Sequence, residues 1–214
     1  MKHLALGNIN ISRVVEFEGP FVQPQQLLPE AKSEVIESHK HWLAPNFLDA
    51  NGMFIMSIHT YVIRTTHHTI LVDTCVGNDK NRALFPGWSK MQGPYLQTLE
   101  HVAGVKPEQV DYVLCTHLHV DHVGWNTRLV NGKWVPTFPN AKYLFARKEW
   151  EFWKQESERD SSTGDGSIVD SVMPIVEAGK AVLVEGDHAI DDQVFLEPTP
   201  GHTPGHVCVP VKGG

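Results

Sequence analysis

The spacing of apolar residues predicts a chain in which short strands and helices alternate. Apolar and polar residues alternate from Ile9 to Phe17, which is typical of a strand with one buried face. Two further strands, Met53 to Thr65 and Thr69 to Asp73, are separated by a short polar turn. Apolar residues then recur at helical spacing from Tyr95 to Val102, and Gly104 follows as a helix end.

The second half of the chain continues this alternation. The apolar, β-branched run from Val110 to Cys115 predicts a buried strand, and Asn131-Gly132 between two apolar pairs predicts a hairpin. The other expected elements are a strand over 141–146, a helix over 147–155, a helix over 167–178 kinked at Pro174, and strands over 182–185 and 194–197. Residues 156–166 are expected to form a polar, solvated connection. Hairpins and crossovers together predict mixed sheets covered by helices, an α/β (α+β) fold.

Residues 19–52 depart from this pattern, because they are irregular and contain proline, asparagine and glutamine, with one helical turn expected near 30–38. Two interpretations stay open. The segment is either a loose N-terminal extension without a role or an active-site flap whose Phe21, Trp42 and Phe47 line a pocket. No internal repeat or linker is found, so we predict one domain over residues 1–214.

Composition excludes several classes of function. The 214 residues are 41% hydrophobic and 20% charged, which is typical of a globular protein. A net charge of −7 without a basic run gives no footprint for nucleic acid. No apolar run has the length of a membrane span or of a signal peptide, and three scattered cysteines argue against a disulfide framework. We therefore expect a cytoplasmic protein that binds neither nucleic acid nor membrane.

The strongest chemical signal is the sequence THLHVDH at residues 116–122. Imidazole nitrogens and carboxylate oxygens bind a borderline divalent ion such as zinc at about 2.0–2.2 Å. The motif follows a predicted buried strand, and open α/β sheets build sites at the carboxyl ends of strands. His117 and His119 can converge on one ion, and Asp121 and His122 point toward a second place. A His-rich surface loop without a role is the alternative, which this spacing disfavours.

A second motif, TPGHTPGH at residues 199–206, follows far along the chain. With it the chain resembles the metallo-β-lactamase-fold hydrolases, whose marks are HxHxDH and a later Gly-His that follows a strand. Ile70 to Thr74 looks like the family's first motif, a strand that ends in Asp. The order of elements from Met53 to Val209 is also similar. Within the family the chain looks most like the lactonase and organophosphate or aryl-ester hydrolase branch.

The resemblance implies a four-layer αββα sandwich with mixed β-sheets. In the family, a bridging Asp and a last His ligand come on later elements, whereas this chain ends at Gly214, shortly after His206. We therefore expect an N-terminal fragment of a longer protein, in which the C-terminal part of the sandwich is missing.

The resemblance also implies a binuclear metal site. His117, His119 and His202 would hold the first ion, and Asp121 with His122 would hold the second. Three protein ligands leave an open position for water, whose pKa a bound ion lowers toward about 7, and two ions about 3.5–4 Å apart clamp the attacking and leaving oxygens. Asp121 is the predicted catalytic residue, because it can orient the metal-activated hydroxide.

Several neighbours of these ligands are given supporting roles. By resemblance, Asp73 braces the ligand loop, since a carboxylate among apolar residues must be paired. His206, which follows Pro204-Gly205, is expected to brace its loop rather than to bind metal. Trp125 is either a hydrophobic wall of the site or ordinary packing, and His59 is either a core or a lip residue.

The sequence thus predicts a metal-dependent hydrolase that attacks a small-molecule ester, lactone or phosphotriester. Two Zn²⁺ ions are expected in the full-length enzyme, although the same ligands accept manganese, cobalt or iron. One alternative is a non-catalytic or inactive metal-binding fragment of such an enzyme. The other is an iron-dependent oxidoreductase on the same scaffold. The oligomeric state is left open, with a homodimer among the alternatives.

Overall fold

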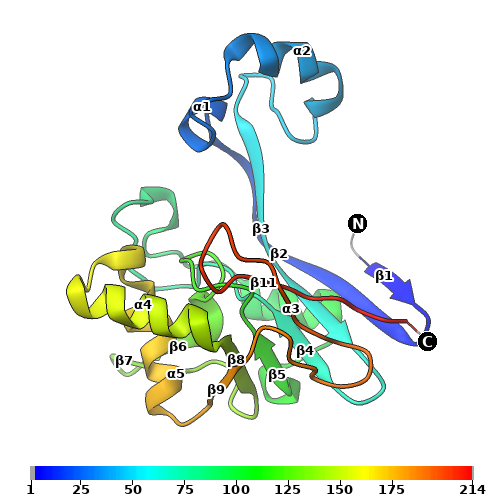
Figure 1. Ribbon diagram of the computed structural model, residues 1–214, viewed down its shortest axis with the longest axis vertical. Coiled ribbons are helices and arrows are strands. Elements are labelled where there is room, and N and C mark those ends of the chain that lie inside the picture. Colours follow the sequence, from blue (N-terminus) through cyan, green and yellow to red (C-terminus); the bar gives the residue numbers. More distant parts are fainter. Residues whose placement is uncertain (1–2, 214) are drawn as a thin grey trace. The chain divides into compact units, whose positions relative to one another are not determined.

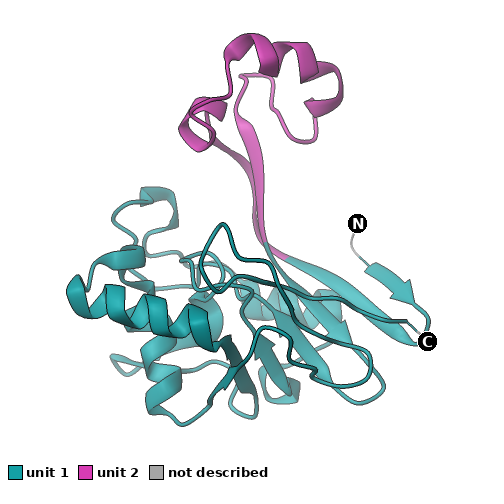
Figure 2. Ribbon diagram, in the orientation of Figure 1, with its two compact units in different colours: residues 1–14, 59–214 teal, residues 15–58 magenta. Residues whose placement is uncertain are grey.

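The computed structural model describes residues 3–213 and separates into two compact units. The first unit comprises residues 1–14 and 59–214, and the second comprises residues 15–58 (Figure 2). Each unit is described by itself below. The prediction of a single domain over residues 1–214 stays a prediction.

A seven-stranded mixed sheet is the largest element, with the order β1-β2-β3-β4-β5-β8-β9 (Figure 1). Its strands are β1 (His3–Leu6), β2 (Ile9–Val22), β3 (Phe54–Arg64), β4 (Thr69–Val72), β5 (Tyr112–Leu114), β8 (Lys142–Ala146) and β9 (Ala181–Val184). Strand β1 pairs antiparallel with β2, and β3 with β4. From β4 to β9 the pairing is parallel, with Leu71 opposite Val113 and Val113 opposite Tyr143. The four parallel strands place their carboxyl ends at one edge.

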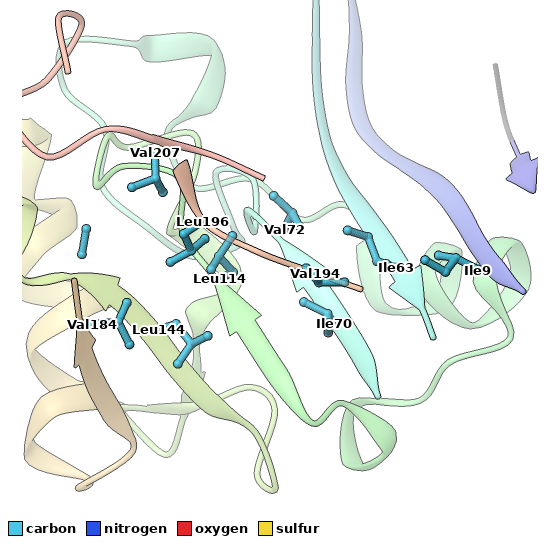
Figure 3. Packing of buried hydrophobic residues seen from close by; sticks show 11 residues of the cluster. Ile9, Ile63, Ile70, Val72, Leu114, Leu144, Val184, Val194, Leu196 and Val207 are labelled. Carbon is cyan, nitrogen blue, oxygen red and sulfur yellow. The ribbon is translucent and has the colours of Figure 1, made fainter. Parts of the chain in front are cut away.

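The parallel strands are apolar on both faces because both faces are covered. Ile70, Val72, Leu114 and Leu144 lie on one face, within a cluster of buried residues (Figure 3). The chain after β9 covers this face, and it contributes Val194, Leu196 and Val207 to the same cluster. This covering segment contains a two-stranded sheet of β10 (Glu197–Pro198) and β11 (Val207–Cys208).

The remaining elements of the first unit lie between and after the strands. They are α3 (Tyr95–Ala103), α4 (Arg147–Arg159), α5 (Met173–Glu177), a hairpin of β6 (Thr127–Val130) and β7 (Lys133–Pro136), 3₁₀ helices at Pro86–Trp88, Pro107–Gln109, Gly124–Asn126 and Thr163–Gly166, and a π-helix at Ile168–Val172. Two local predictions are confirmed. Gly104 ends α3 with a φ of 64°, and Asn131 and Gly132 form the hairpin turn with φ values of 50° and 77°.

Other local predictions need correction. Residues 156–166 are not simply a solvated connection, because α4 continues to Arg159 and the carboxylate of buried Asp165 accepts a hydrogen bond from the Leu84 amide at 3.2 Å. The predicted strand over 194–197 is reduced to isolated bridges from Val194 and Phe195, with β10 beginning only at Glu197.

The second unit is more regular than predicted. It contains α1 (Pro24–Leu27) and α2 (Ser33–Leu43) beside parts of β2 and β3, so residues 19–52 are not an irregular extension with one helical turn. Trp42 and Phe47 are 54% and 56% exposed. A role as an active-site flap stays a prediction.

The predicted fold class is confirmed as a mixed α/β fold with one large mixed sheet. Within residues 3–213 the other two sheets are two-stranded, so this part of the chain contains one full β-layer of the expected sandwich and a segment packed on it. No helix within the same residues is long and apolar enough to cross a membrane.

One buried polar group lies outside the predicted site, and we name it the Lys80 cluster: Lys80, Arg82, Thr127 and Asp170. The side chains of Lys80 and Arg82 are fully buried. Arg82 donates to both carboxylate oxygens of Asp170, at 2.7 and 2.9 Å. Lys80 donates to the Thr127 hydroxyl at 2.8 Å and lies 3.6 Å from Asp170. The cluster joins the segment after β4 to the π-helix.

Candidate metal centre

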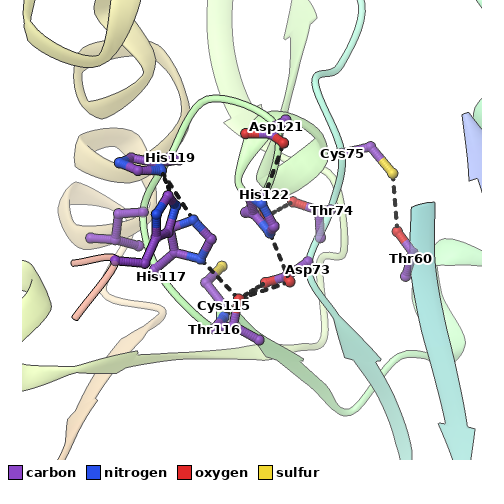
Figure 4. Close-up of polar contacts among 12 residues, drawn as sticks. Thr60, Asp73, Thr74, Cys75, Cys115, Thr116, His117, His119, Asp121 and His122 are labelled. Atoms are coloured by element: carbon purple, nitrogen blue, oxygen red, sulfur yellow. Dashed lines mark hydrogen bonds and ion pairs between the residues drawn. The ribbon is translucent and has the colours of Figure 1, made fainter. Parts of the chain in front are cut away.

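The candidate centre is built on the carboxyl ends of two neighbouring parallel strands. Asp73 directly follows β4 and Thr116 lies just beyond β5. The Asp73 carboxylate accepts hydrogen bonds from the Thr116 amide at 2.8 Å and from the Thr116 hydroxyl at 2.9 Å (Figure 4). It also lies 2.8 Å from Nδ1 of His122. Asp73 therefore contacts both ends of the loop 116–122, as expected of a bracing residue.

Three imidazoles converge beside this brace, and we name them the histidine cluster: His117, His119 and His202. Nδ1 of His119 lies 3.1 Å from Nε2 of His117 and 3.0 Å from Nε2 of His202. One nitrogen from each ring lies within 4.8 Å of the other two. Ligands that bind one zinc ion tetrahedrally at about 2.1 Å lie about 3.4 Å apart, so these nitrogens fit a single ion. His117 is buried, His119 is half-buried and His202 is exposed.

The neighbours of His117 favour its ligating form. The Thr116 hydroxyl has one proton, which it donates to Asp73, so it accepts from Nδ1 of His117 at 3.1 Å. Nε2 of His117 is then unprotonated and faces the cluster. Burial, followed by the nearby imidazoles, lowers the pKa of His117 and of His119. These two donors are thereby favoured in the neutral form that metal binding requires.

Asp121 and His122 lie beside the histidine cluster but are paired with each other. Nε2 of His122 lies 3.3 Å from the Asp121 carboxylate, and the rings of His122 and His117 are 4.0 Å apart. Burial opposes a charge on His122, but the carboxylates of Asp73 and Asp121 outweigh it and raise the pKa of His122 to about 10. Burial of Asp121 is likewise outweighed by its contact with His122, so the pKa of Asp121 is lowered. A second ion bound by Nε2 of His122 and the Asp121 carboxylate would take the place of the proton that they share.

The structure also shows the contacts of three residues for which the sequence suggested supporting roles: His206, Trp125 and His59. Nδ1 of His206 lies 2.9 Å from the Thr199 hydroxyl, the contact expected of a residue that braces its own loop. Trp125 is buried and stacks on Tyr95 with 5.0 Å between ring centres, which matches ordinary packing. His59 is half-buried and meets Tyr61 edge to face, so it is neither fully core nor fully exposed.

Sequence reasoning missed two residues of α4 that contact the centre. Glu149 is only 1% exposed, and its carboxylate accepts from the Leu118 amide at 3.1 Å and from the Gly205 amide at 2.8 Å. It also accepts from the indole nitrogen of Trp153 at 2.7 Å. The helix begins among charged residues, which are typical of a solvated surface. The available signal was the spacing of Glu149 and Trp153, which places both on one helix face.

Comparison with known proteins agrees with this architecture. The family model of the metallo-β-lactamase superfamily matches residues 55–214. An N-acyl homoserine lactonase of Bacillus cereus is 27% identical over 170 residues, which cover 74% of this chain and 60% of the relative. A second N-acyl homoserine lactonase, from a Bacillus species, is 28% identical over 157 residues, covering 68% of this chain and 54% of the relative. The chain thus spans little more than half the length of these relatives.

Solved structures show the same fold. A probable metal-dependent hydrolase from Staphylococcus aureus superposes with a TM-score of 0.76 at 18% identity, covering 99% of this chain and 71% of that one. A dizinc quorum-quenching lactonase in complex with a product has a TM-score of 0.70 at 21% identity, with coverage of 100% and 70%. The family match covers most of the chain, and the fold and the histidine cluster accord with it. The chain therefore belongs to the metallo-β-lactamase superfamily.

Proposed function

We propose that the protein is a metal-dependent hydrolase that opens small-molecule lactones, with simple esters as weaker substrates. The observation that carries the proposal is the convergence of three imidazole nitrogens within 4.8 Å of one another. A bound divalent ion would supply Lewis acidity and would lower the pKa of a water molecule. The three histidines use three positions of a tetrahedral ion and leave the fourth open, as catalytic sites do.

The side chains around the cluster have distinct proposed roles. His117, His119 and His202 bind the ion, and Thr116 holds His117 in the tautomer that presents Nε2. Asp121 is the proposed catalytic carboxylate, which orients the attacking water and holds its proton. No serine, cysteine or lysine nucleophile is required. Asp121 and His122 are also the proposed ligands of a second ion.

Zinc is the proposed metal, because an all-nitrogen donor set suits it, although manganese, cobalt and iron accept the same ligands. One structural neighbour is described as a dizinc lactonase, which supports two ions per complete enzyme. This lactonase and another structural neighbour are described in complex with the product N-hexanoyl-homoserine. Because the curated relatives are N-acyl homoserine lactonases, these lactones are the first substrates to test.

Metal content per chain is the decisive first measurement, made by elemental analysis of protein purified without chelator. Hydrolysis of N-acyl homoserine lactones, aryl esters and phosphotriesters is then followed by proton release in a pH-stat. His117→Ala should lose metal and activity together. The control, His101→Ala, removes an exposed imidazole on α3 and should change neither.

Each outcome discriminates between the alternatives. About two zinc ions with lactone hydrolysis supports the proposal in full, and about one supports the histidine cluster alone. Bound metal without hydrolysis of any substrate would favour the inactive metal-binding fragment. Iron with redox activity would favour the oxidoreductase. Absence of metal from the wild-type protein would contradict the proposal.

A further inference from the structure

Glu149 joins three parts of the candidate centre through one buried carboxylate. The Leu118 amide lies between His117 and His119, and it donates to Oε1 at 3.1 Å. The Gly205 amide lies in the loop that follows His202, and it donates to Oε2 at 2.8 Å. The two loops that carry the histidine cluster are thus hydrogen-bonded to the two oxygens of a single side chain.

The Gly205 contact is also fixed sterically. A Cβ atom at position 205 would lie 2.3 Å from the Glu149 amide nitrogen and 2.7 Å from its Cα. Such distances are shorter than any real contact of a Cβ atom, so only glycine lets this loop reach the start of α4. Two separate features therefore hold the His202 loop against α4: the close backbone approach at Gly205 and the hydrogen bond from the Gly205 amide to Glu149.

A third connection runs through Trp153, one helical turn after Glu149. Its indole N–H donates to Oε1 of Glu149 at 2.7 Å, which fixes the plane of the ring. The ring meets His119 edge to face, with 5.2 Å between ring centres and an interplanar angle of 73°. Glu149 therefore acts on the orientation of His119 as well as on the position of the two loops.

A backbone hydrogen bond also links the loops at their strand ends, where the Val207 amide donates to the Thr116 carbonyl at 3.0 Å. That bond fixes the start of the first loop and the end of the second, and it involves none of the ligand-bearing residues. Glu149 supplies the second point of attachment, beside the ligands themselves.

We propose that Glu149 is a positioning residue that holds His117, His119 and His202 at the mutual distances one metal ion requires. This inference rests on the proposed function, because it concerns the affinity and geometry of the same metal site. Groups that orient metal ligands typically contribute a factor of about 10–100 to metal affinity. Glu149 should act in this range without contacting the ion.

The test uses Glu149→Gln, which keeps the length of the side chain and one acceptor oxygen but sets an amide N–H₂ against one of the N–H donors. Glu151→Gln is the matched control, since Glu151 is an exposed carboxylate on the same helix. Zn²⁺ affinity is measured by competition with a chromophoric chelator, and the visible bands of the Co²⁺-loaded protein report ligand geometry. Glu149→Gln should bind Zn²⁺ about 10–100-fold more weakly and should shift the Co²⁺ bands. Glu151→Gln should match the wild-type protein.

Two further variants keep the inference falsifiable if Glu149→Gln does not fold. Trp153→Phe removes one donor and keeps an aromatic ring against His119, and it should weaken Zn²⁺ binding less than Glu149→Gln. Gly205→Ala should displace the His202 loop and weaken binding with Glu149 intact. Wild-type affinity and an unchanged Co²⁺ spectrum in the folded variants would overturn the inference, even if their unfolding midpoint fell.

Amide hydrogen exchange of the metal-free protein separates this inference from the proposed function. The Leu118 and Gly205 amides should exchange faster in Glu149→Gln than in the control. Unchanged exchange at both amides would overturn the positioning role. A wild-type protein that binds no Co²⁺ or Zn²⁺ would contradict the proposed function, and the exchange experiment would still decide whether Glu149 holds the two loops.

Discussion

The histidine cluster and the Lys80 cluster are both groups of polar side chains in the first unit. The Lys80 cluster pairs cations with a carboxylate, whereas the histidine cluster sets like groups against one another. In the Lys80 cluster, Arg82 binds both oxygens of Asp170, and Lys80 has the Thr127 hydroxyl and the ring of Trp134, 3.8 Å from its Nζ. In the histidine cluster, three imidazole nitrogens face one another at about the spacing of ligands around an ion.

This difference separates a structural role from a binding role. Buried polar groups are stable when each finds its partner inside the protein. In the Lys80 cluster the charged groups pair with one another, and of the Arg82 nitrogens only Nε has no hydrogen-bond partner within residues 3–213. Imidazole nitrogens that face one another are best satisfied by a shared cation. Substitutions in the Lys80 cluster should therefore affect folding, and substitutions in the histidine cluster should affect metal binding.

The largest effect should come from Arg82→Met, which removes both guanidinium donors from the partly buried Asp170 carboxylate and leaves it the Ser171 hydroxyl at 2.6 Å and Lys80 at 3.6 Å. Breaking a buried ion pair on one side costs about 3–5 kcal/mol of unfolding free energy. Denaturant unfolding measures this, with exposed Arg128→Met as the control, expected within about 0.5 kcal/mol of wild type. A loss of Zn²⁺ affinity at unchanged stability in Arg82→Met would contradict the structural role of the Lys80 cluster.

His202→Gln should weaken zinc binding rather than stability, because it removes one donor of the histidine cluster. If about 10–16 kcal/mol of zinc binding is shared among four ligands, one ligand contributes about 3 kcal/mol, or roughly 100-fold in affinity. His206→Gln is the matched change in the same loop, and it should have a much smaller effect because His206 is bound to Thr199. Competitive zinc titration of both variants measures the difference. Equal losses would assign His206 to the ligand set.

Asp73→Asn should weaken zinc binding by about 10–100-fold through the loop it braces. The backbone at Asp73 has a φ of 59°, a conformation that asparagine also adopts, so the substitution removes charge and one acceptor without backbone strain. Asp79→Asn is the control, with a φ of 66° and a side chain that accepts from Gln92. Zinc affinity that falls equally in both variants would remove the special role of Asp73.

The smallest effect should be the pH dependence of stability that Lys80 confers. Burial, opposed by the nearby Asp170 carboxylate and aided by the Arg82 cation, lowers the pKa of Lys80 to about 7, against about 10.4 in an unfolded chain. Above pH 7 the folded state releases this proton first and the unfolded state binds more protons, so the unfolding free energy rises with pH. The gain should be about 2 kcal/mol between pH 7 and 9.

Urea unfolding of the wild-type protein and of Lys80→Met at pH 6, 7 and 9 measures this contribution as the difference between the two proteins. The variant lacks the titrating group, so its unfolding free energy should gain less between pH 7 and 9. Parallel curves would show that Lys80 titrates at its ordinary pKa.

Local sequence determined the elements whose signals act within a few residues. Turn chemistry at Asn131-Gly132 and at Gly104 specified the hairpin and the end of α3, and apolar runs specified β4, β5 and β8. The spacing within THLHVDH likewise indicated metal ligands before any fold was known. These signals are local because backbone dihedrals and side-chain periodicity depend on neighbouring residues.

Only the tertiary structure decided which distant groups meet. The sequence contained His202, Glu149 and Lys80, but their partners lie 83, 31 and 47 residues away in His119, Leu118 and Thr127. A carboxylate such as Glu149 has the same local pattern as a solvated one, and what makes it buried is the approach of Gly205 from the end of the chain. Hydrogen-bond satisfaction is a property of the packed molecule, which is why the ligands and Asp73 could be predicted from the sequence and its resemblance, whereas Glu149 and Trp153 were found only in the fold.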